Sequence, residues 1–389
     1  MDSFKQAPVT HLLNQIHENT AKYLTFLSAQ SLPEPSFENG EGIPQGQRIP
    51  IDVQTARDAA IEAAGELRLI LLGPLALVMS SQADQFLMLA MQYISGLPLK
   101  DVTRFFRLAA SRRVFREVSK GAIEHTTASQ ELIHNPKLVA WLMNIADEFW
   151  LALARIVDAT DRWPGSEEPN ESGYSLGHST CDNVFDVIKH SPERQQRYMD
   201  VIGYLLQGYD SSKVRVLVDI GGAHGEVAIA LAQKYQSMEI VVQDKKEVIQ
   251  GLGEHVPATL KDRIHGMEHD FFTTQPVRDA DVYLFRWVFH CWSDKYCVKI
   301  LQSLVPSLKR GSKIVINDLC IHEPGGSSLS AARESLEMDI MMMAFNNACE
   351  RDTETWEMLF ETADPGFKFF GIKMPARARM AIIEAEWEM

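Results

Sequence analysis

The chain is poor in cysteine and has no pattern that would pair its few thiols. Five cysteines occur among 389 residues: Cys181, Cys291, Cys297, Cys320 and Cys349. No two of them are separated by only two residues, and no histidine spacing suits zinc. An odd number without such spacing gives no signal of a disulfide framework or of a structural metal site. We therefore expect reduced, mostly buried thiols, as in a cytosolic protein.

Long apolar runs are also lacking. The longest, residues 67–79, carries Arg68 and is interrupted at Gly73 and Pro74, so it is too short to cross a hydrocarbon layer of roughly 30 Å. Residues 1–15 are mixed polar, with no apolar core after a basic flank, so we expect no secretory signal. These absences predict a soluble, cytoplasmic protein with no membrane partner.

Positive charge is the third deficit. The 38 Lys and Arg residues face 52 Asp and Glu residues, which leaves a net charge of -14. Such a charge repels the phosphate backbone of nucleic acids and an anionic membrane surface. Nucleic acid is therefore not an expected partner. In contrast, 46% hydrophobic and 23% charged residues are typical of a globular protein, and the length fits two to three domains of about 150 residues.

The N-terminal part has helical patterns followed by a small hairpin. Apolar residues recur at helical spacing in residues 11–27, 56–79, 82–96 and 99–110, and residues 31–51 form a Pro, Gly and Glu-rich connector. Residues 114–118 alternate like a strand, Gly121 supplies a turn, and residues 123–126 can pair back. This order predicts a winged-helix arrangement. The acidic charge favours packing or dimerisation over DNA binding.

The pattern changes after residues 158–177, where Asp, Pro, Gly, Ser and Glu cluster. Short runs rich in Val and Ile then alternate with helical stretches at 226–235 and 295–308. The predicted strands are 214–220, 240–243, 282–285 and 313–317. Such alternation predicts a doubly wound, Rossmann-like α/β domain over residues 175–389, with a ligand crevice at the carboxyl ends of its strands. Residues 1–165 form the predicted helical domain.

A glycine turn follows the first of these strands, in the segment VLVDIGGAHG that ends at Gly225. Glycines permit positive φ and let a ligand approach bare backbone, and the following helix has free N–H groups. The dinucleotide pattern G-x-G-x-x-G requires glycine at 221, 223 and 226, but Ala223 and Glu226 occupy two of these positions. The turn is therefore not a nicotinamide dinucleotide site.

Two carboxylates flank this turn and indicate a different ligand. Asp219 at the strand tip would repel a pyrophosphate and favour a cation. Asp244, after the next predicted strand, stands where an acid accepts hydrogen bonds from ribose hydroxyls. A cationic nucleoside suits both, and S-adenosylmethionine is the common one. The alternative is a tight turn whose aspartates only cap helices.

Ordered motifs across most of the chain give a family resemblance. They are FFRLAASRRVFREVSKGAIEHTTASQEL, LVDIGGAHG, VVQDKKEVI, HDFF, FRWVFHCWSD, IVINDLCI and ERDTETW. In this order they resemble the class I, caffeate O-methyltransferase-like enzymes of plants and fungi. These methylate small molecules with S-adenosylmethionine and carry a winged-helix-like dimerisation domain.

The resemblance implies a set of cofactor-binding residues. In the turn these are Asp219, Gly221 and Gly222, with Asp244 at the ribose. Asp270 and Phe271 correspond to the adenine site, although on their own they would equally be a strand end with core aromatics. Arg286 stands where plant enzymes more often have lysine and keeps the cation.

His290 is the candidate general base. Methyl transfer to oxygen needs a collinear arrangement, worth roughly 7–11 kcal/mol, and a group that removes the proton of a phenol with a pKa of about 10. His290 follows the strand at 282–285, at the crevice edge. The family places carboxylates at two later positions, here Asp318 and Glu350, to orient the histidine. Cys291 stands where the family commonly has aspartate, and we interpret it as a pocket-lining thiol.

The resemblance also implies a substrate wall on a methionine-rich helix. Methionines adapt to flat apolar ligands, although core packing alone would explain them as well. Met341 and Phe345 are the first candidates, and Phe149, Trp150 and His134 from the N-terminal domain are expected to complete the wall or reach it across a dimer.

The leading hypothesis is an S-adenosylmethionine-dependent O-methyltransferase acting on an aromatic or polyketide-type hydroxyl of a secondary metabolite. The expected assembly is a homodimer through the helices at 56–79 and 82–96. A second hypothesis keeps the cofactor and replaces methylation by a dehydration or pericyclic ring closure, for which His134 and Arg197 are extra polar groups. A third is a non-catalytic winged-helix sensor of a small molecule.

Overall fold

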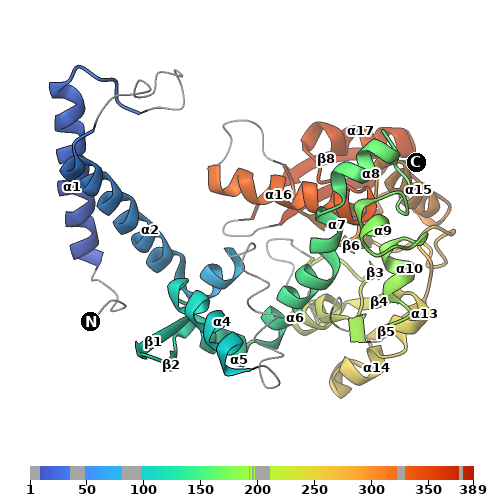
Figure 1. Ribbon diagram of the computed structural model, residues 1–389. Coiled ribbons are helices and arrows are strands. Elements are labelled where there is room, and N and C mark those ends of the chain that lie inside the picture. The colour runs from blue at the N-terminus through green and yellow to red at the C-terminus, as the bar shows by residue number, and fades with distance from the viewer. Residues whose placement is uncertain are drawn as a thin grey trace. The chain divides into compact units, whose positions relative to one another are not determined.

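The computed structural model describes residues 9–35, 49–80, 98–191, 193–194, 197, 211–321, 329–375 and 380–389. The chain divides into two compact units, Met1–Leu142 and Met143–Met389 (Figure 1). The predicted helix at 82–96 lies outside the described residues. Among the described helices, none is both long and apolar enough to cross a membrane.

The first unit starts with two helices that pack side by side, α1 (Val9–Ala29) and α2 (Ile51–Ser80). Helix α2 bends at Gly73, where φ is 76°, because the next residue, Pro74, has no N–H to continue the helical bonding. These helices confirm the predictions at 11–27 and 56–79, with ends a few residues further out.

A helix, a hairpin and two more helices follow in the first unit. They are α4 (Leu99–Ser111), β1 (Phe115–Ser119), β2 (Ala122–His125), α5 (Thr127–His134) and α6 (Pro136–Asn144). The strands are antiparallel, and Gly121 turns between them with φ of 82°. Phe115 and Val114 anchor the hairpin in a core that also contains Ala109 and Leu138. The predicted helix-and-hairpin order is therefore present.

The second unit is built on a seven-stranded sheet with the order β5-β4-β3-β6-β7-β9-β8. Its strands are β3 (Val216–Ile220), β4 (Glu239–Asp244), β5 (Ile264–Glu268), β6 (Val282–Arg286), β7 (Lys313–Asp318), β8 (Phe367–Lys373) and β9 (Ala381–Trp387). The first five pair in parallel, whereas β9 is antiparallel to β7 and β8. This confirms the α/β fold. The strands β5, β8 and β9 were not predicted.

Helices connect and cover these strands. Those along the sheet are α12 (Glu226–Lys234), α13 (Lys246–Ile249), α14 (Leu252–His255), α15 (Asp294–Leu304), α16 (Leu329–Asn346) and α17 (Thr353–Ala363). Shorter 3₁₀ turns lie at Ala258–Leu260, Phe289–Cys291 and Val305–Ser307. The helix predicted at 295–308 thus tightens into a 3₁₀ turn near its end, where Pro306 follows Val305.

A further group of short helices opens the second unit. It consists of a π-helical turn at Ile145–Phe149, α7 (Trp150–Leu153), α8 (Ile156–Arg162), α9 (Gly173–Gly177) and α10 (Val184–Ile188). The first four pack against one another, and α7, α9 and the π-helical turn also contact α16. For this reason the division between units lies after Leu142, nearer the N-terminus than the composition change at 158–177.

Candidate active site

His290 lies in the 3₁₀ turn Phe289–Cys291, just beyond the carboxyl end of β6. The chain turns sharply there, and Trp287 takes the left-handed conformation with φ of 55°. The Trp287 ring lies 4.6 Å from the imidazole ring. His290 is buried, and β6, the strand before it, lies between β3 and β7 inside the sheet. It therefore occupies the sheet edge at which ligands bind in this class of fold.

Two carboxylates contact His290 from separate elements. Its Nδ1 atom lies 3.0 Å from the Oε1 atom of Glu350, in the loop after α16. Its backbone N–H donates to Oδ2 of Asp318, the last residue of β7, at 3.2 Å. The three predicted residues are thus brought together. Asp318 holds the backbone of His290, whereas Glu350 holds the imidazole.

Two carboxylate oxygens in this cluster are buried without a hydrogen-bond partner among the described residues. They are Oδ1 of Asp318 and Oε2 of Glu350. A buried oxygen of this kind is costly unless a ligand or water satisfies it. The cluster therefore has acceptors to offer to a hydroxyl group.

Burial and charge act against each other at His290. Burial lowers its pKa, but the neighbouring Cys291 and Glu350 outweigh burial and hold the pKa well above the ordinary value of 6.5. At Asp318, burial dominates and raises the pKa to about 6, although His290 opposes it. The imidazole is therefore a strong proton acceptor, next to a carboxyl group that retains its proton more readily than usual.

Cys291 is buried, and its thiol contacts the backbone of its own loop. Its Sγ atom lies 3.7 Å from the Trp287 carbonyl oxygen, and its own carbonyl accepts a hydrogen bond from Nδ2 of Asn346 at 2.8 Å. The next residue, Asn347, donates to the carbonyls of Glu168 and Glu171 at 2.9 and 2.8 Å. Among the described residues, no cluster of His, Cys, Asp and Glu could hold a metal ion.

The glycine turn lies at the carboxyl end of β3. The N–H groups of Gly221 and Gly222 donate to the Gln243 carbonyl at 2.8 and 3.2 Å, so these two amides are used within the protein. At Gly222 a Cβ atom would lie 2.7 Å from the Asp219 carboxyl group and 2.8 Å from a Val242 methyl. Glycine is therefore required at 222 by packing.

Asp219 is buried beneath this turn. Its Oδ2 atom has no hydrogen-bond partner among the described residues, and burial raises its pKa to about 7. Asp244 ends β4 and is half-buried; it accepts hydrogen bonds from the N–H groups of Ala223 and Lys245 at 3.0 and 2.7 Å. Its pKa is raised to about 6, chiefly by burial. The unsatisfied Asp219 oxygen and the half-buried Asp244 fit a cationic nucleoside such as S-adenosylmethionine.

The remaining cofactor candidates differ in exposure. Asp270 is exposed, and its carboxylate accepts from the Phe272 N–H at 3.0 Å. Phe271 is half-buried, with its ring 6.0 Å from that of Trp292. Arg286 is buried at the end of β6 and donates to Asn317 Oδ1 at 3.1 Å. Burial lowers the pKa of Arg286, and Asp219 is the first of the acids that oppose this.

The candidates for the substrate wall are mostly packed in the interior. Phe149 and Phe345 stack with ring centroids 4.4 Å apart, and both are buried, as is Met341. Phe149 belongs to the second unit, whereas His134 is exposed at the end of α5 in the first unit. The stack joins the π-helical turn to α16.

Sequence reasoning missed several contacts around His290. Trp287 covers the imidazole, Asp339 accepts the Glu350 N–H at 2.9 Å, and Arg351 bonds to the loop that carries His290. Two signals were present: Arg351 is the second residue of the ERDT segment, and Asp339 is an acid within the methionine-rich run.

Known proteins are similar to this chain over most of its length. Residues 167–368 match the model of a family described as the O-methyltransferase domain. The O-methyltransferase PaMT of Phomopsis amygdali is 33% identical over 97% of this chain and 96% of its own length. The grayanic acid biosynthesis cluster O-methyltransferase of Cladonia grayi is 33% identical over 95% of this chain and 86% of its own length.

Solved structures share the fold at lower identity. OxaC in complex with sinefungin and meleagrin has a TM-score of 0.70 and 20% identity, over 97% of this chain and 99% of that one. The complex of LepI with S-adenosylmethionine has a TM-score of 0.66 and 20% identity, over 96% of this chain and 100% of that one.

Proposed function

The chain belongs to the S-adenosylmethionine-dependent O-methyltransferases, and from that premise we propose that it methylates a hydroxyl group of an aromatic or polyketide-type secondary metabolite. The observation that carries this proposal is the buried contact of 3.0 Å between His290 and Glu350 at the carboxyl edge of the sheet. The name of the Cladonia grayi relative, which refers to grayanic acid biosynthesis, supports an acceptor from secondary metabolism.

In this mechanism His290 removes the proton of the acceptor hydroxyl. Because a carboxylate can only accept, Nδ1 donates to Glu350, which leaves Nε2 as the nitrogen that takes the proton. Glu350 then stabilises the imidazolium that forms. Asp318 fixes the backbone of His290, and its second oxygen is available to a substrate hydroxyl. Bound S-adenosylmethionine supplies an electrophilic methyl group.

The cofactor is held, in our proposal, at the glycine turn. Asp219 would face the cationic end of the ligand, the backbone of Gly221 and Gly222 would lie against it, and Asp244 would bond to the ribose hydroxyls. Asp270 and Phe271 would contact the adenine, and Arg286 would balance the charge of Asp219. Support comes from the buried Oδ2 atom of Asp219, which has no hydrogen-bond partner among the described residues.

The test is incubation of the protein with methyl-labelled S-adenosylmethionine and a panel of resorcinols and other phenols. Labelled product is expected, and His290→Ala should lower the transfer rate by about 10²- to 10⁴-fold. Calorimetry with S-adenosylhomocysteine should give the same affinity for both proteins. Transfer at an unchanged rate by the variant would remove His290 from the mechanism.

A second function, dehydration or pericyclic ring closure, is favoured by one observation. The raised pKa of His290 makes a protonated, hydrogen-bond-donating imidazole available near neutral pH, which suits stabilisation of negative charge in a substrate. A solved structure described as a pericyclic reaction enzyme shares this fold, with a TM-score of 0.67. An isomerised or dehydrated product formed while the labelled donor stays unconsumed would decide for this function.

We further propose a cytoplasmic homodimer formed through the N-terminal helices. Support comes from apolar side chains exposed on α1 and α2, such as Leu13, Ile61 and Leu71, which are 50%, 64% and 72% exposed. Light scattering should give twice the mass of the chain, and Ile61→Asp should give the monomer. A monomeric wild-type protein at working concentrations would contradict the proposal.

A further inference from the structure

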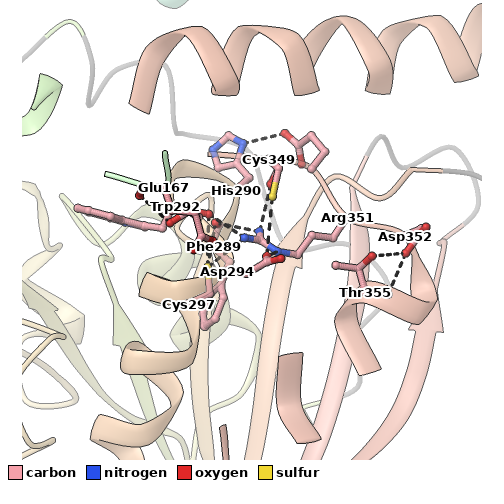
Figure 2. Close-up of polar contacts among 12 residues, drawn as sticks. Glu167, Phe289, His290, Trp292, Asp294, Cys297, Cys349, Arg351, Asp352 and Thr355 are labelled. Carbon is pink, nitrogen blue, oxygen red and sulfur yellow. Dashed lines mark hydrogen bonds and ion pairs between the residues drawn. The ribbon is translucent and has the colours of Figure 1, made fainter. Parts of the chain in front are cut away.

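Arg351 is a buried arginine with an unusually complete set of partners. It follows Glu350 directly and is 1% exposed. Its guanidinium donates to Asp294 Oδ1 at 2.7 Å, to the carbonyls of Phe289 and Cys349 at 3.1 Å each, to the Trp292 carbonyl at 2.7 Å, and to Cys297 Sγ at 3.3 Å (Figure 2).

One nitrogen of this guanidinium connects the backbone segments that carry His290 and Glu350. Nη1 donates both to the carbonyl of Phe289, the residue before His290, and to that of Cys349, the residue before Glu350. The separation of these carbonyls therefore depends on a single planar group. Because the donors of a guanidinium are fixed in one plane, they constrain geometry more than a flexible ammonium does.

The backbone of Arg351 ties the same group to a third segment. Arg351 forms a parallel bridge with Cys320, and its carbonyl accepts the N–H of Ile321 at 3.0 Å. Cys320 lies two residues after Asp318. Arg351 thus connects the segments that carry His290, Glu350 and Asp318, through its side chain on one side and its main chain on the other.

Electrostatics and packing hold the guanidinium in place. A buried charge is tolerated when it is paired and its donors are satisfied. Asp294, at the start of α15, supplies the opposite charge, and the Trp356 ring lies 5.3 Å from the guanidinium carbon. Lysine at this position would keep the charge but could not reach these carbonyls in one plane.

We propose that Arg351 is a positioning residue, whose guanidinium sets the relative placement of His290 and Glu350 and so directs the imidazole towards the acceptor hydroxyl. This inference deepens the proposed function and rests on it for the role of His290. The placement itself can be measured without any acceptor.

The decisive variant is Arg351→Lys, and Arg263→Lys is its matched control. Arg263 also donates to three backbone carbonyls, those of Ala232, Tyr235 and Met238, at 2.7 to 3.2 Å. It lies at the other end of β4 and β5, remote from β6 and β7 in the sheet order. Both substitutions therefore remove an arginine that donates hydrogen bonds to several backbone carbonyls. Only Arg351 lies next to the contact between His290 and Glu350.

The first readout is the titration of His290 by NMR in the full chain, with its signal identified by its absence in His290→Gln. In Arg351→Lys we expect the pKa of His290 to fall by about one unit, because a displaced Glu350 stabilises the imidazolium less. Arg263→Lys should leave it unchanged even if the melting temperature falls. An unchanged titration in folded Arg351→Lys overturns the proposal.

The second readout is methyl transfer from labelled S-adenosylmethionine to phenols. Arg351→Lys should lower kcat by about 100-fold, as expected for a small misplacement of a reacting group, with KM for the donor unchanged. If wild-type protein transfers no methyl group, the proposed function fails, while the titration still decides the present inference. If Arg351→Lys does not fold, Asp294→Asn is the second variant, because it removes the charged partner of Arg351. It should also lower the pKa of His290. An unchanged pKa in this variant overturns the proposal.

Discussion

The Nδ1 atom of His290 and the Oε1 atom of Glu350 lie 3.0 Å apart, with side chains that are 8% and 1% exposed. They come from two loops, one after β6 and the other between α16 and α17. A histidine–carboxylate contact withdrawn from water is stronger than one at the surface, because fewer solvent dipoles screen it. This contact is the centre of the predicted chemistry.

Replacement of Glu350 by Gln keeps the size of the side chain and removes its charge. The carboxylate helps to raise the pKa of His290, so we expect the acidic limb of the rate profile to move to lower pH. We also expect kcat to fall by about 10²- to 10⁴-fold, the range for acid–base assistance. Glu354→Gln, at an exposed position in the first turn of α17, is the control. An acidic limb at the same pH in both variants would contradict this assignment.

Asp219 should make stability depend on pH. Burial raises its pKa from the ordinary value of 3.8 to about 7. The folded chain therefore binds this proton more tightly than the unfolded chain, and the resulting stabilisation is complete below the unfolded pKa and disappears as the pH rises through about 7. Asp219→Asn cannot titrate.

The difference in melting temperature, variant minus wild type, should be more positive at about pH 8 than at about pH 5. The two pH units between 5 and a pKa of about 7 correspond to about 2–3 kcal/mol of stability. Because about 1 kcal/mol shifts the melting temperature of a domain of this size by about 2–4 °C, we expect a change of about 5–10 °C. Asp262→Asn, at an exposed turn, should show the same difference at both pH values. If Asp219→Asn behaves in the same way as this control, Asp219 is not protonated more readily in the fold.

Gly222→Ala tests the packing of the glycine turn. The new methyl group would lie within 2.8 Å of Asp219 and Val242, so these side chains must move. We expect a loss of about 1–3 kcal/mol in unfolding free energy, typical of overpacking, and weaker binding of S-adenosylhomocysteine. Gly253→Ala has no atom within 4 Å of the added carbon and should leave the affinity unchanged. Equal affinities of the two variants for S-adenosylhomocysteine would show that the glycine turn does not contribute to binding this ligand.

The methionines of α16 allow a test of the substrate wall. Met341 is 3% exposed and Met343 on the same helix is 38% exposed. Met341→Leu conserves volume, so it should cost less than about 1.5 kcal/mol of stability. It should raise KM for a phenolic acceptor by about tenfold, the scale of a methylene mismatch in a pocket. Met343→Leu should leave KM as it is, and a matching KM in the two variants would exclude Met341 from the wall.

The parallel core of the second unit could be predicted because its strands are buried on both faces. Such strands are nearly continuous apolar runs, as in residues 282–285 of β6. The strand β5 was missed because His265 and Gly266 interrupt its apolar character at the edge of the sheet. The strand β8 was missed for a related reason, since Gly371 and exposed lysines accompany its aromatic residues.

At the site, sequence motifs predicted which residues meet but not through which atoms. The carboxylates of Asp318 and Glu350 were both expected to support His290. Only the three-dimensional chain path determines that Asp318 bonds to the backbone and Glu350 to the ring. Arg351 was overlooked because an arginine beside a glutamate in sequence resembles a solvated pair, and its burial depends on contacts with residues far away in the chain.

The two amides at the end of α16 limit how this helix can respond to ligands. Asn346 is bonded to the loop of Cys291, and Asn347 to the carbonyls of Glu168 and Glu171. Because these hydrogen bonds hold the C-terminal end of α16, the helix cannot shift along its axis without breaking several of them at once. In the proposed substrate wall, acceptors of different shape would therefore be accommodated by rotamers of the methionine side chains. A design that aims to widen the range of acceptors should alter side-chain volume along α16 and keep both asparagines.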